Sequence, residues 1–405
     1  MVPGMQSCDA LVIGGGPAGL MAAERLLLSG RSVLLADAKP SLARKFLMAG
    51  KSGLNLTNMA PRGAFLDAYG ASSGALAPMV SEFGAEAVRD WAENLGQETF
   101  VGSTGRLFPT AMKASPLLRA WLARLDSLSI DRRTRWRWTG WGNGAATFDT
   151  PDGIERVKAR ATVLALGGGS WARLGSDGAW TGTFRQHGIT TIPFAPSNAG
   201  VAVAWSSHMR RHFGAPLKGI ALAAGSLRSR GEITIAQSGI EGGGIYPLAP
   251  ALRASEPLYL DLAPDLDSAQ LAQRFASQGR RRTLSERLRR AAGLSSAEIA
   301  MAQECGRPLP QEPKALAATI KALRIAYTGL APLDRAISTT GGVPWSALDD
   351  GLMIKDRPGV FCAGEMIDWD APTGGYLLTA CFATGRWAGQ KASQWLETAP
   401  PADGP

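Results

Sequence analysis

The stretch Asp9-Ala10-Leu11-Val12-Ile13-Gly14-Gly15-Gly16-Pro17-Ala18-Gly19-Leu20 decides the fold. It combines an apolar strand, a turn of glycines and the start of a helix. Gly14, Gly16 and Gly19 have the G-x-G-x-x-G spacing: the first permits a tight turn, the second admits a phosphate to the backbone, and the third lets helix and strand pack closely. The helix then directs free N–H groups and the positive end of its dipole at that phosphate. The stretch therefore predicts an α/β, Rossmann-like domain that binds a dinucleotide.

The residues that follow support this prediction. Pro17 suits a first helical turn, where its missing N–H group costs nothing, and Pro17 and Ala18 should lie beside the phosphates. A second strand, residues 32–36, ends on Asp37, 18 positions after Gly19, where a carboxylate accepts hydrogen bonds from an adenosine ribose. The alternative is an ordinary βαβ unit with a glycine turn. Strand, glycines, helix and acid in this order favour the dinucleotide site.

Composition limits the class of protein. The chain has 405 residues, of which 45% are hydrophobic, so it can bury a large core and form two or three domains. No apolar run reaches the roughly 18 residues that a membrane-spanning helix needs. The four cysteines form no C-x-x-C pair, which is typical of a reducing, cytoplasmic location, and with only three histidines we expect no metal site.

Two basic segments bear on the partner. The formal net charge is +9 and the pI near 9.6, which suit an anionic partner such as RNA, a membrane surface or a phosphorylated substrate. Residues 132–141 alternate arginine and tryptophan with period two and predict one strand, either half-buried with its tryptophans inward or a face that stacks bases and binds phosphates. The other segment is a set of helical arginines, which form either a solvated face or an RNA footprint: Arg274, Arg280, Arg281, Arg282, Arg287, Arg289 and Arg290.

The middle of the chain differs from its ends in the secondary structure that its sequence predicts. The apolar strand 160–166 runs into Gly167, Gly168 and Gly169, which we expect to pass close to the cofactor; no ribose acid follows them, which disfavours a second dinucleotide site for NADPH. Short strands and turns follow from about residue 195, and helical segments from about residue 265. The predicted organisation is a nucleotide-binding domain in two parts, 1–194 and 333–398, an inserted β-rich domain, 195–262, an inserted helical domain, 263–332, and a flexible tail, 399–405.

The end of the chain returns to glycine chemistry. A buried strand, 359–363, ends at Gly364 and Glu365, and Gly374-Gly375-Tyr376 opens a helix that runs to about residue 396. A helix N-terminus after paired glycines is a second site for an anion or a carbonyl group. Placed against a flavin, it would stabilise negative charge at the N1–C2 carbonyl side of the reduced ring.

Several motifs together resemble a known family. They are Gly14–Gly19, the loop from Arg44-Lys45 to Asn55-Leu56-Thr57-Asn58, Thr340-Gly341-Gly342-Val343, and Cys362-Ala363-Gly364-Glu365 with Gly374-Gly375-Tyr376. In the same order and over nearly the whole chain, these resemble the BaiN-like FAD-dependent flavoproteins, which include aminoacetone-oxidase-like and bile-acid-reductase-like proteins. Residues 239–246 and 377–381 depart from the pattern of the relatives, so the chain resembles a distinct subgroup.

The resemblance implies non-covalent FAD in a flavoprotein of the two-dinucleotide-binding type. It implies FAD contacts at Gly14, Gly16, Gly19, Asp37, Lys45, Asn55, Gly364, Glu365, Gly374, Gly375 and Tyr376. The residue pattern adds Pro17, Ala18, Ser52, Gly167, Gly168 and Gly342 as further cofactor-binding candidates. Some relatives are linked to reduction of carbon–carbon double bonds, including conversion of uridine to dihydrouridine in ribosomal RNA.

The first hypothesis is therefore a reductase that transfers hydride from flavin N5 to an activated alkene of an anionic substrate, uridine in ribosomal RNA among them, with NAD(P)H as a candidate donor. Candidate proton donors are Cys381, Tyr246 and Glu241. The alternatives are a small-molecule flavin oxidase or reductase and a non-catalytic flavin-bearing redox sensor. The sequence leaves the substrate and the donor open.

Overall fold

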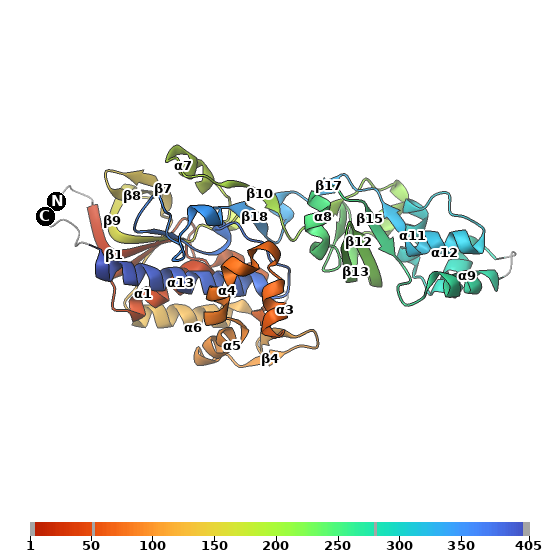
Figure 1. Ribbon diagram of the computed structural model, residues 1–405, viewed down its shortest axis with the longest axis horizontal. Helices are drawn as coiled ribbons and strands as arrows, with labels where there is room; N and C mark the ends of the chain where they lie inside the picture. Colours follow the sequence, from red (N-terminus) through yellow and green to blue (C-terminus); the bar gives the residue numbers. More distant parts are fainter. Residues whose placement is uncertain (1–4, 51–52, 279–281, 400–405) are drawn as a thin grey trace. The chain divides into compact units, whose positions relative to one another are not determined.

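The computed structural model describes residues 5–50, 53–278 and 282–399, and Figure 1 shows its elements in chain order. The chain forms two compact units: unit 1 joins the residues before 196 to those after 337, and unit 2 is residues 196–337. The first boundary lies one residue from the predicted one and the second five residues later. The predicted tail lies outside the described residues except for Ala399.

A seven-stranded sheet forms the centre of unit 1. Its order is β6-β2-β1-β9-β8-β7, with β19 paired to β9. The pairs β1–β2, β1–β9, β2–β6 and β9–β19 are parallel, and β7, β8 and β9 form an antiparallel meander. The strands are β1 (Met5–Ile13), β2 (Val33–Asp37), β6 (Asp131–Thr134), β7 (Arg137–Gly142), β8 (Ala145–Thr150), β9 (Gly153–Leu164) and β19 (Val360–Cys362). Residues from both ends of the chain thus build one sheet, as the sequence predicts.

Two glycine-started helices pack in parallel against each other beneath this sheet in Figure 1, α1 (Pro17–Leu28) and α13 (Tyr376–Thr398). Gly385 lies against the backbone of Ala18, and Gly389 against that of Ala22, so closely that a Cβ atom at Gly389 would lie 2.6 Å from the Ala22 oxygen. Tyr376 precedes Gly385 by nine residues, whereas Pro17 precedes Ala18 by one. At 1.5 Å per residue, α13 therefore begins roughly 12 Å beyond the start of α1.

Smaller elements surround the sheet of unit 1. Strands β3 (Thr57–Asn58), β5 (Arg106–Pro109) and β4 (Thr99–Val101) form a three-stranded antiparallel sheet, and β10 (Ile192–Pro196) pairs with β18 (Thr339–Gly342). The remaining helices are α2 (Arg44–Ala49), α3 (Arg62–Asp67), α4 (Ser73–Glu82), α5 (Ala85–Asn94), α6 (Ala114–Ser127) and α7 (Trp180–Gln186), with 3₁₀ turns η1 (Gly70–Ser72), η2 (Ala172–Leu174), η6 (Trp345–Ala347) and η7 (Gly364–Met366).

The single strand predicted over residues 132–141 is wrong. Arg135 has a left-handed backbone, with φ of 61°, and this turn separates β6 from β7. The N–H groups of Arg135 and Trp136 donate to the carbonyls of Lys39 and Asp37, so the chain leaves one edge of the sheet and joins the meander at the other. The hairpin predicted at Asn143-Gly144 is present between β7 and β8.

Unit 2 is one domain where the sequence predicted two. Its seven-stranded sheet has the order β16-β15-β12-β13-β14-β11-β17, and strands that follow the helices occupy both ends of that order. Side chains from helices and strands, such as Leu271, Leu288 and Ile233, share one buried core. The strands are β11 (Val201–Ala202), β12 (Pro216–Ala224), β13 (Leu227–Ala236), β14 (Gly239–Glu241), β15 (Leu258–Asp261), β16 (Leu323–Ile325) and β17 (Gly329–Leu330).

The helices of unit 2 begin where local capping residues require. Asp267, Thr283 and Ser295 each accept a hydrogen bond from the backbone three residues later, in complete capping boxes. The helices are α8 (Ala249–Arg253), α9 (Ser268–Ala276), α10 (Leu284–Ala292), α11 (Ser296–Cys305) and α12 (Pro313–Lys321), with 3₁₀ segments η3 (Ser207–His212), η4 (Tyr246–Leu248) and η5 (Leu333–Arg335). None of the helices in the described part of the chain has the length and apolar character to cross a membrane.

Candidate functional site

The glycine turn between β1 and α1 has the geometry that a phosphate needs. Gly14 has φ of +105°, and a Cβ atom there would overlap the backbone of Ala165. A Cβ atom at Gly19 would overlap the Gly14 carbonyl oxygen, so Gly19 permits the close packing of helix on turn. At Gly16, by contrast, a Cβ atom would meet nothing within 4 Å. Gly14 and Gly19 therefore determine the shape of the turn, and the space beside Gly16 is free for a ligand.

Asp37 is placed at the end of β2 beside this turn. Its Oδ2 accepts a hydrogen bond of 2.8 Å from the Gly15 N–H, and its Oδ1 accepts one of 2.7 Å from the Lys39 N–H. Burial raises the pKa of the Asp37 carboxyl above its usual range, although these two donors lower it. Each oxygen keeps a further lone pair, which suits a ribose hydroxyl.

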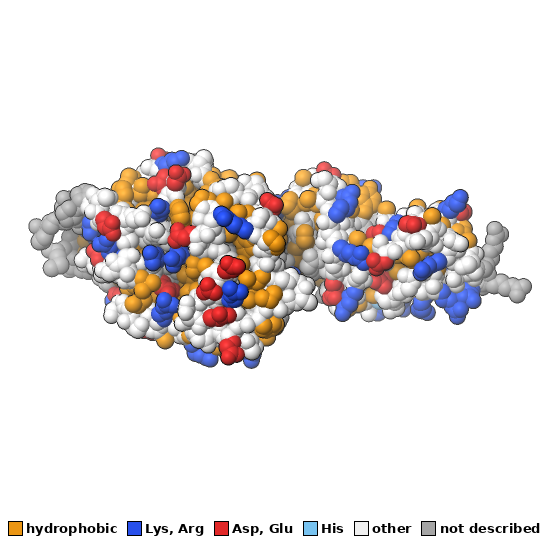
Figure 2. All heavy atoms as spheres, turned by 60° about the horizontal axis from the view of Figure 1, so that its bottom comes forward, with side chains coloured by type: hydrophobic (Ala, Val, Ile, Leu, Met, Phe, Trp, Pro, Cys, Tyr) orange, Lys and Arg blue, Asp and Glu red, His pale blue; other side chains and the backbone are white. Residues whose placement is uncertain are grey.

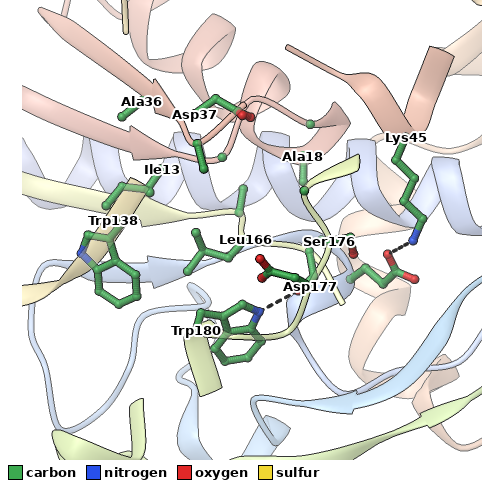
Figure 3. Close-up of a pocket in the computed structure, with 18 of the residues that line it drawn as sticks. Ile13, Ala18, Ala36, Asp37, Lys45, Trp138, Leu166, Ser176, Asp177 and Trp180 are labelled. Atoms are coloured by element: carbon green, nitrogen blue, oxygen red, sulfur yellow. Dashed lines mark hydrogen bonds and ion pairs between the residues drawn. The ribbon is translucent and has the colours of Figure 1, made fainter. Parts of the chain in front are cut away.

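A cavity of about 430 Å³ runs along the turn and the ends of the parallel strands. Figure 3 shows Asp37 and Ala36 on one side of it, Trp180 across from them, and Lys45 toward another end. The predicted residues that line it are Gly14, Gly16, Pro17, Ala18, Asp37, Lys45, Gly167, Gly364, Glu365 and Cys381. Residues from both ends of the chain thus meet in one pocket.

Charged groups gather at the Lys45 end of the cavity. Lys45 Nζ donates to Glu365 Oε2 at 2.6 Å and to Ser170 Oγ at 2.8 Å. The Glu365 side chain is 8% exposed, and its Oε1 accepts a hydrogen bond from the Thr339 N–H. A Cβ atom at Gly168 would lie 3.1 Å from the Glu365 carboxyl carbon, so Gly168 supports this cluster and does not line the cavity.

The start of α13 lies next to the loop that contains Asn55. Gly374 and Gly375 have φ of +117° and +99°, and a Cβ atom at Gly375 would overlap the backbone of Thr57. Thr379 Oγ1 donates to Thr57 Oγ1 at 2.7 Å. The Asn55 Oδ1 atom is buried without a hydrogen-bond partner among the described residues. A buried acceptor of this kind needs a donor, which a ligand can supply.

These features fit FAD. The open mouth at Gly16 suits a pyrophosphate, Asp37 suits the ribose, and the unpaired Asn55 oxygen and the start of α13 suit a polar ring. Gly342, with φ of +113°, packs against the Met366 carbonyl and is not among the residues that line the cavity. Asn55, Gly374, Gly375 and Tyr376 do not line it either, so the cofactor contacts of all five stay predictions. Ser52 lies outside the described residues.

The three candidate proton donors differ in position. Cys381 lines the cavity, with Sγ 3.9 Å from the place of a Cβ atom at Gly364, close to the start of α1. Burial raises the pKa of its thiol to about 12, so the thiol keeps its proton at neutral pH. Glu241, paired with Thr234 in the sheet, and Tyr246, whose phenol pKa is raised by burial, belong to unit 2. Of the three, Cys381 is among the residues that line this cavity of unit 1, and the roles of all three stay predictions.

The tryptophans of the segment 132–141, predicted as a base-stacking face, are buried within the fold. Trp136 and Trp138 are 9% and 8% exposed and line the cavity, so they are not free to stack on an external base. Arg132, Arg133 and Arg137 form ion pairs with Asp126, Asp131 and Asp177, respectively. The half-buried alternative for this segment holds, although over two strands.

The arginine-rich helices of unit 2 are only partly available. Arg287 is buried and donates to Gln311, so it supports the fold and is wrong as an RNA contact. Arg274, Arg282, Arg289 and Arg290 are exposed, and Figure 2 shows many basic side chains on this unit. Arg280 and Arg281 lie outside the described residues.

Several cavity residues escaped the sequence analysis as site residues. Ser176 and Trp180 line the cavity and donate hydrogen bonds to the carbonyls of Gly168 and Gly167. Their only signal is that they follow the triple glycine within 13 residues. Nowhere in the described parts of the chain do three or more His, Cys, Asp or Glu side chains form a group that could hold a metal ion.

Comparison with known proteins gives a consistent result. Residues 8–391 match the model of the HI0933-like protein Rossmann domain. The chain is 24% identical to a 3-dehydro-bile acid delta(4,6)-reductase of Clostridium scindens, covering 95% of this chain and 98% of the relative. It is 22% identical to a ribosomal RNA dihydrouridine synthase of Escherichia coli, covering 92% and 94%.

Solved structures resemble the fold. A flavocytochrome c3 fumarate reductase in an open conformation superposes with a TM-score of 0.53 at 15% identity, covering 96% of this chain and 79% of that one. A quinol-fumarate reductase superposes with a TM-score of 0.54 at 14% identity, covering 99% and 73%. At these identities, the likeness shows the fold alone.

Proposed function

Because the chain belongs to the HI0933-like family of FAD-dependent oxidoreductases, we propose that it reduces a carbon–carbon double bond conjugated with a carbonyl group, using NAD(P)H as the electron donor. The observation that supports this best is the cavity itself. It joins a phosphate-binding turn to the ion pair of Lys45 with Glu365, and residues from both ends of the chain line it. Bound FAD supplies hydride transfer there.

The names of the two relatives point to the same bond chemistry. One describes reduction of the delta(4,6) bonds of a 3-dehydro-bile acid, and the other describes formation of dihydrouridine in ribosomal RNA. Each is the saturation of a double bond conjugated with a carbonyl group. At 22–24% identity we carry over to this chain only the type of bond that is reduced. We do not carry over the substrate of either relative.

Different residues of the chain bind the cofactor and are candidates to supply the proton. Gly16 and the first turn of α1 hold the pyrophosphate, and Asp37 holds the ribose. Lys45 and Glu365 fix each other in the wall of the cavity, and the buried Cys381 thiol stays protonated beside them. Saturation of the bond needs a hydride at one carbon and a proton at the other, and the second comes from an acid of the protein or from water.

The test is anaerobic turnover with a small panel of acceptors. Purified holoenzyme with NADPH or NADH is offered 2-cyclohexenone, a 3-oxo-Δ4 steroid and a uridine-containing ribosomal RNA fragment. The proposal predicts oxidation of the nicotinamide in step with an acceptor that gains two hydrogen atoms by mass spectrometry. Release of hydrogen peroxide in air with no reduced acceptor would support the alternative of a flavin oxidase. A bound flavin that neither NADPH nor NADH reduces would support the alternative of a non-catalytic redox sensor.

RNA is a second candidate substrate, favoured by the exposed arginines of unit 2. Four of them, Arg274, Arg282, Arg289 and Arg290, lie on or beside α9 and α10, in a chain of net charge +9. Binding carried by these charges should weaken steeply with salt. We expect the R289E/R290E double variant to lose RNA affinity while it retains reduction of small acceptors; equal RNA binding by variant and wild type would exclude this footprint.

A further inference from the structure

Arg106 places a cation beside the start of α13, without an acidic partner among the described residues. It is half-buried, at the first position of β5. No described residue forms an ion pair or hydrogen bond with its guanidinium. A half-buried guanidinium without an acid beside it retains five donors for a ligand.

The backbone at Arg106 is held on both sides. Arg106 pairs with Asn58 of β3, and its carbonyl accepts a hydrogen bond of 2.8 Å from the Gly102 N–H. The neighbouring carbonyls of Gly105 and Leu107 accept from Met59 and Leu56 at 2.7 and 2.9 Å. The guanidinium therefore extends from a fixed strand toward a fixed neighbour.

That neighbour is the glycine pair that opens α13. A Cβ atom at Gly374 would lie 3.6 Å from Arg106 Nε and 3.5 Å from the ring of Tyr376, so the cation and the phenol flank Gly374. The Tyr376 ring packs against Phe65 at 4.7 Å, and Tyr69 Oη donates to the Tyr376 carbonyl at 2.9 Å. The positive charge of Arg106 also lowers the pKa of the Tyr376 phenol, against the effect of burial. A cation and a supported aromatic face thus border one open backbone position.

The position along α13 connects this pair to the proposed reaction. The start of α13 lies roughly 12 Å beyond the start of α1, where Gly16 and Ala18 form the phosphate end of the cavity. Cys381 at the cavity wall lies five residues further along the helix than Tyr376. Arg106 is not among the residues that line the cavity, but it lies beside the start of α13, about 12 Å along the paired helices from the phosphate turn. We expect the reacting end of the ligand on this side, opposite the phosphates.

We infer that Arg106 binds the carbonyl or carboxylate oxygen of a planar, conjugated substrate, beside Gly374 and Tyr376. The inference rests on the proposed function and adds a substrate-binding residue and a ligand class to it. When hydride reaches the β carbon of such a substrate, the electron pair of the double bond moves toward the oxygen, and the guanidinium stabilises the negative charge that develops there. The reductant is NAD(P)H through bound FAD, and the α carbon takes a proton.

The experiment measures binding without turnover. Oxidised holoenzyme is titrated with trans-cinnamate, a planar conjugated carboxylate, and with neutral cinnamyl alcohol, followed by the change in flavin absorption near about 450 nm. We compare wild type with R106M, R106K and, as a matched control, R119M, which removes an exposed arginine from α6. FAD content is measured for each variant.

We expect R106M to weaken cinnamate binding at least tenfold, R106K to restore part of it, and R119M and the alcohol to change less than twofold. Failure of wild type to bind cinnamate, or equal binding by R106M and wild type, would overturn the inference. So would a shift of the flavin midpoint potential in R106M with unchanged cinnamate affinity, since Arg106 would then serve the cofactor. The titration contains no NAD(P)H, so no turnover occurs. Its outcome therefore tests the role of Arg106 independently of whether the enzyme reduces a double bond.

Discussion

The two parallel helices α1 and α13 both begin on glycine, yet their N-termini are built differently. The start of α1 is formed by backbone: Gly14 and Gly19 shape it, and Gly16 leaves it open. The start of α13 is bordered by residues of distant segments, with Arg106 beside Gly374 and Thr57 beside Gly375 and Thr379. Backbone N–H groups at a helix start bind phosphate, a group that many ligands share. Side chains around a site distinguish the part of the ligand that reacts.

The difference also separates binding from chemistry along one cavity. The phosphate end needs only local sequence, since a strand, three glycines and a helix suffice to make it. The Lys45–Glu365 end joins residues 320 positions apart, through an ion pair of 2.6 Å. Changes at the first end should abolish cofactor binding, and changes at the second should alter stability and substrate use.

The largest expected effect distinguishes two glycines of the same turn. G14V forces a side chain into the backbone of Ala165 at a positive φ, so we expect loss of FAD binding and a fall of several kcal/mol in the free energy of unfolding, on the order of 3 or more. G16V fills open space, so we expect at least a hundredfold loss of FAD affinity with the apoprotein stability nearly unchanged.

Tryptophan fluorescence during FAD titration and urea unfolding of the apoproteins measure the two quantities. Undiminished FAD affinity in G16V would place the pyrophosphate elsewhere, and equal stability of G14V and G16V would contradict the assignment of separate roles.

The next effect tests the charged end. K45M leaves the Glu365 carboxylate, 8% exposed, without its cation, while Lys45 itself is 25% exposed. We expect a loss of about 1–3 kcal/mol in the free energy of unfolding. The double variant K45M/E365Q should recover part of it, because no unpaired charge remains. Urea unfolding of wild type, K45M, E365Q and the double variant gives the coupling. Additive losses would show that the pair is not coupled.

A smaller effect contrasts two neighbouring arginines of α10. Arg287 is buried and donates to Gln311, so R287A should cost about 1–2 kcal/mol of stability. Arg289 is exposed, so R289A should change stability by less than about 0.5 kcal/mol. Thermal unfolding measures both, and the reverse order of the two losses would contradict the placement of these side chains.

A pH-dependent effect concerns the Cys381 thiol. Its pKa in the folded state is about 12, against an ordinary value of 9.0, so the thiol keeps its proton in the folded chain while an unfolded thiol begins to lose its own near pH 9. The stability that this burial contributes is therefore present below pH 9 and falls as the pH rises toward 12.

We expect native Cys381 to resist iodoacetamide from pH 7 to pH 9, and the C381A variant to lose less stability than wild type between pH 9 and pH 11. Peptide mass spectrometry reads the first result and urea unfolding the second. Rapid alkylation at pH 8 in the folded protein would contradict a buried, protonated thiol.

Sequence reasoning succeeded where short-range patterns dictate the backbone. The strand before Gly14, the acid at Asp37, the turn at Asn143-Gly144 and the helix that opens at Tyr376 each follow from adjacent residues. These features locate the phosphate end of the site and the return of the chain to the same sheet.

It did not succeed where distant contacts decide. The left-handed turn at Arg135 depends on hydrogen bonds to residues 37 and 39, and the sheet of unit 2 is completed by strands after the helices. The spacing of arginines gave no sign that Arg287 points inward. The ion pair of Lys45 with Glu365 needs the whole sheet to bring its members together.

We expect one FAD to extend from the glycine turn before α1 toward the start of α13. Equilibrium titration of the apoprotein with FAD and with FMN tests it most directly, since FMN lacks the adenylate that Asp37 and the glycine turn would bind. We predict one FAD per chain and at least a hundredfold weaker binding of FMN. Equal affinity for the two flavins, or no saturable binding of FAD, would contradict it.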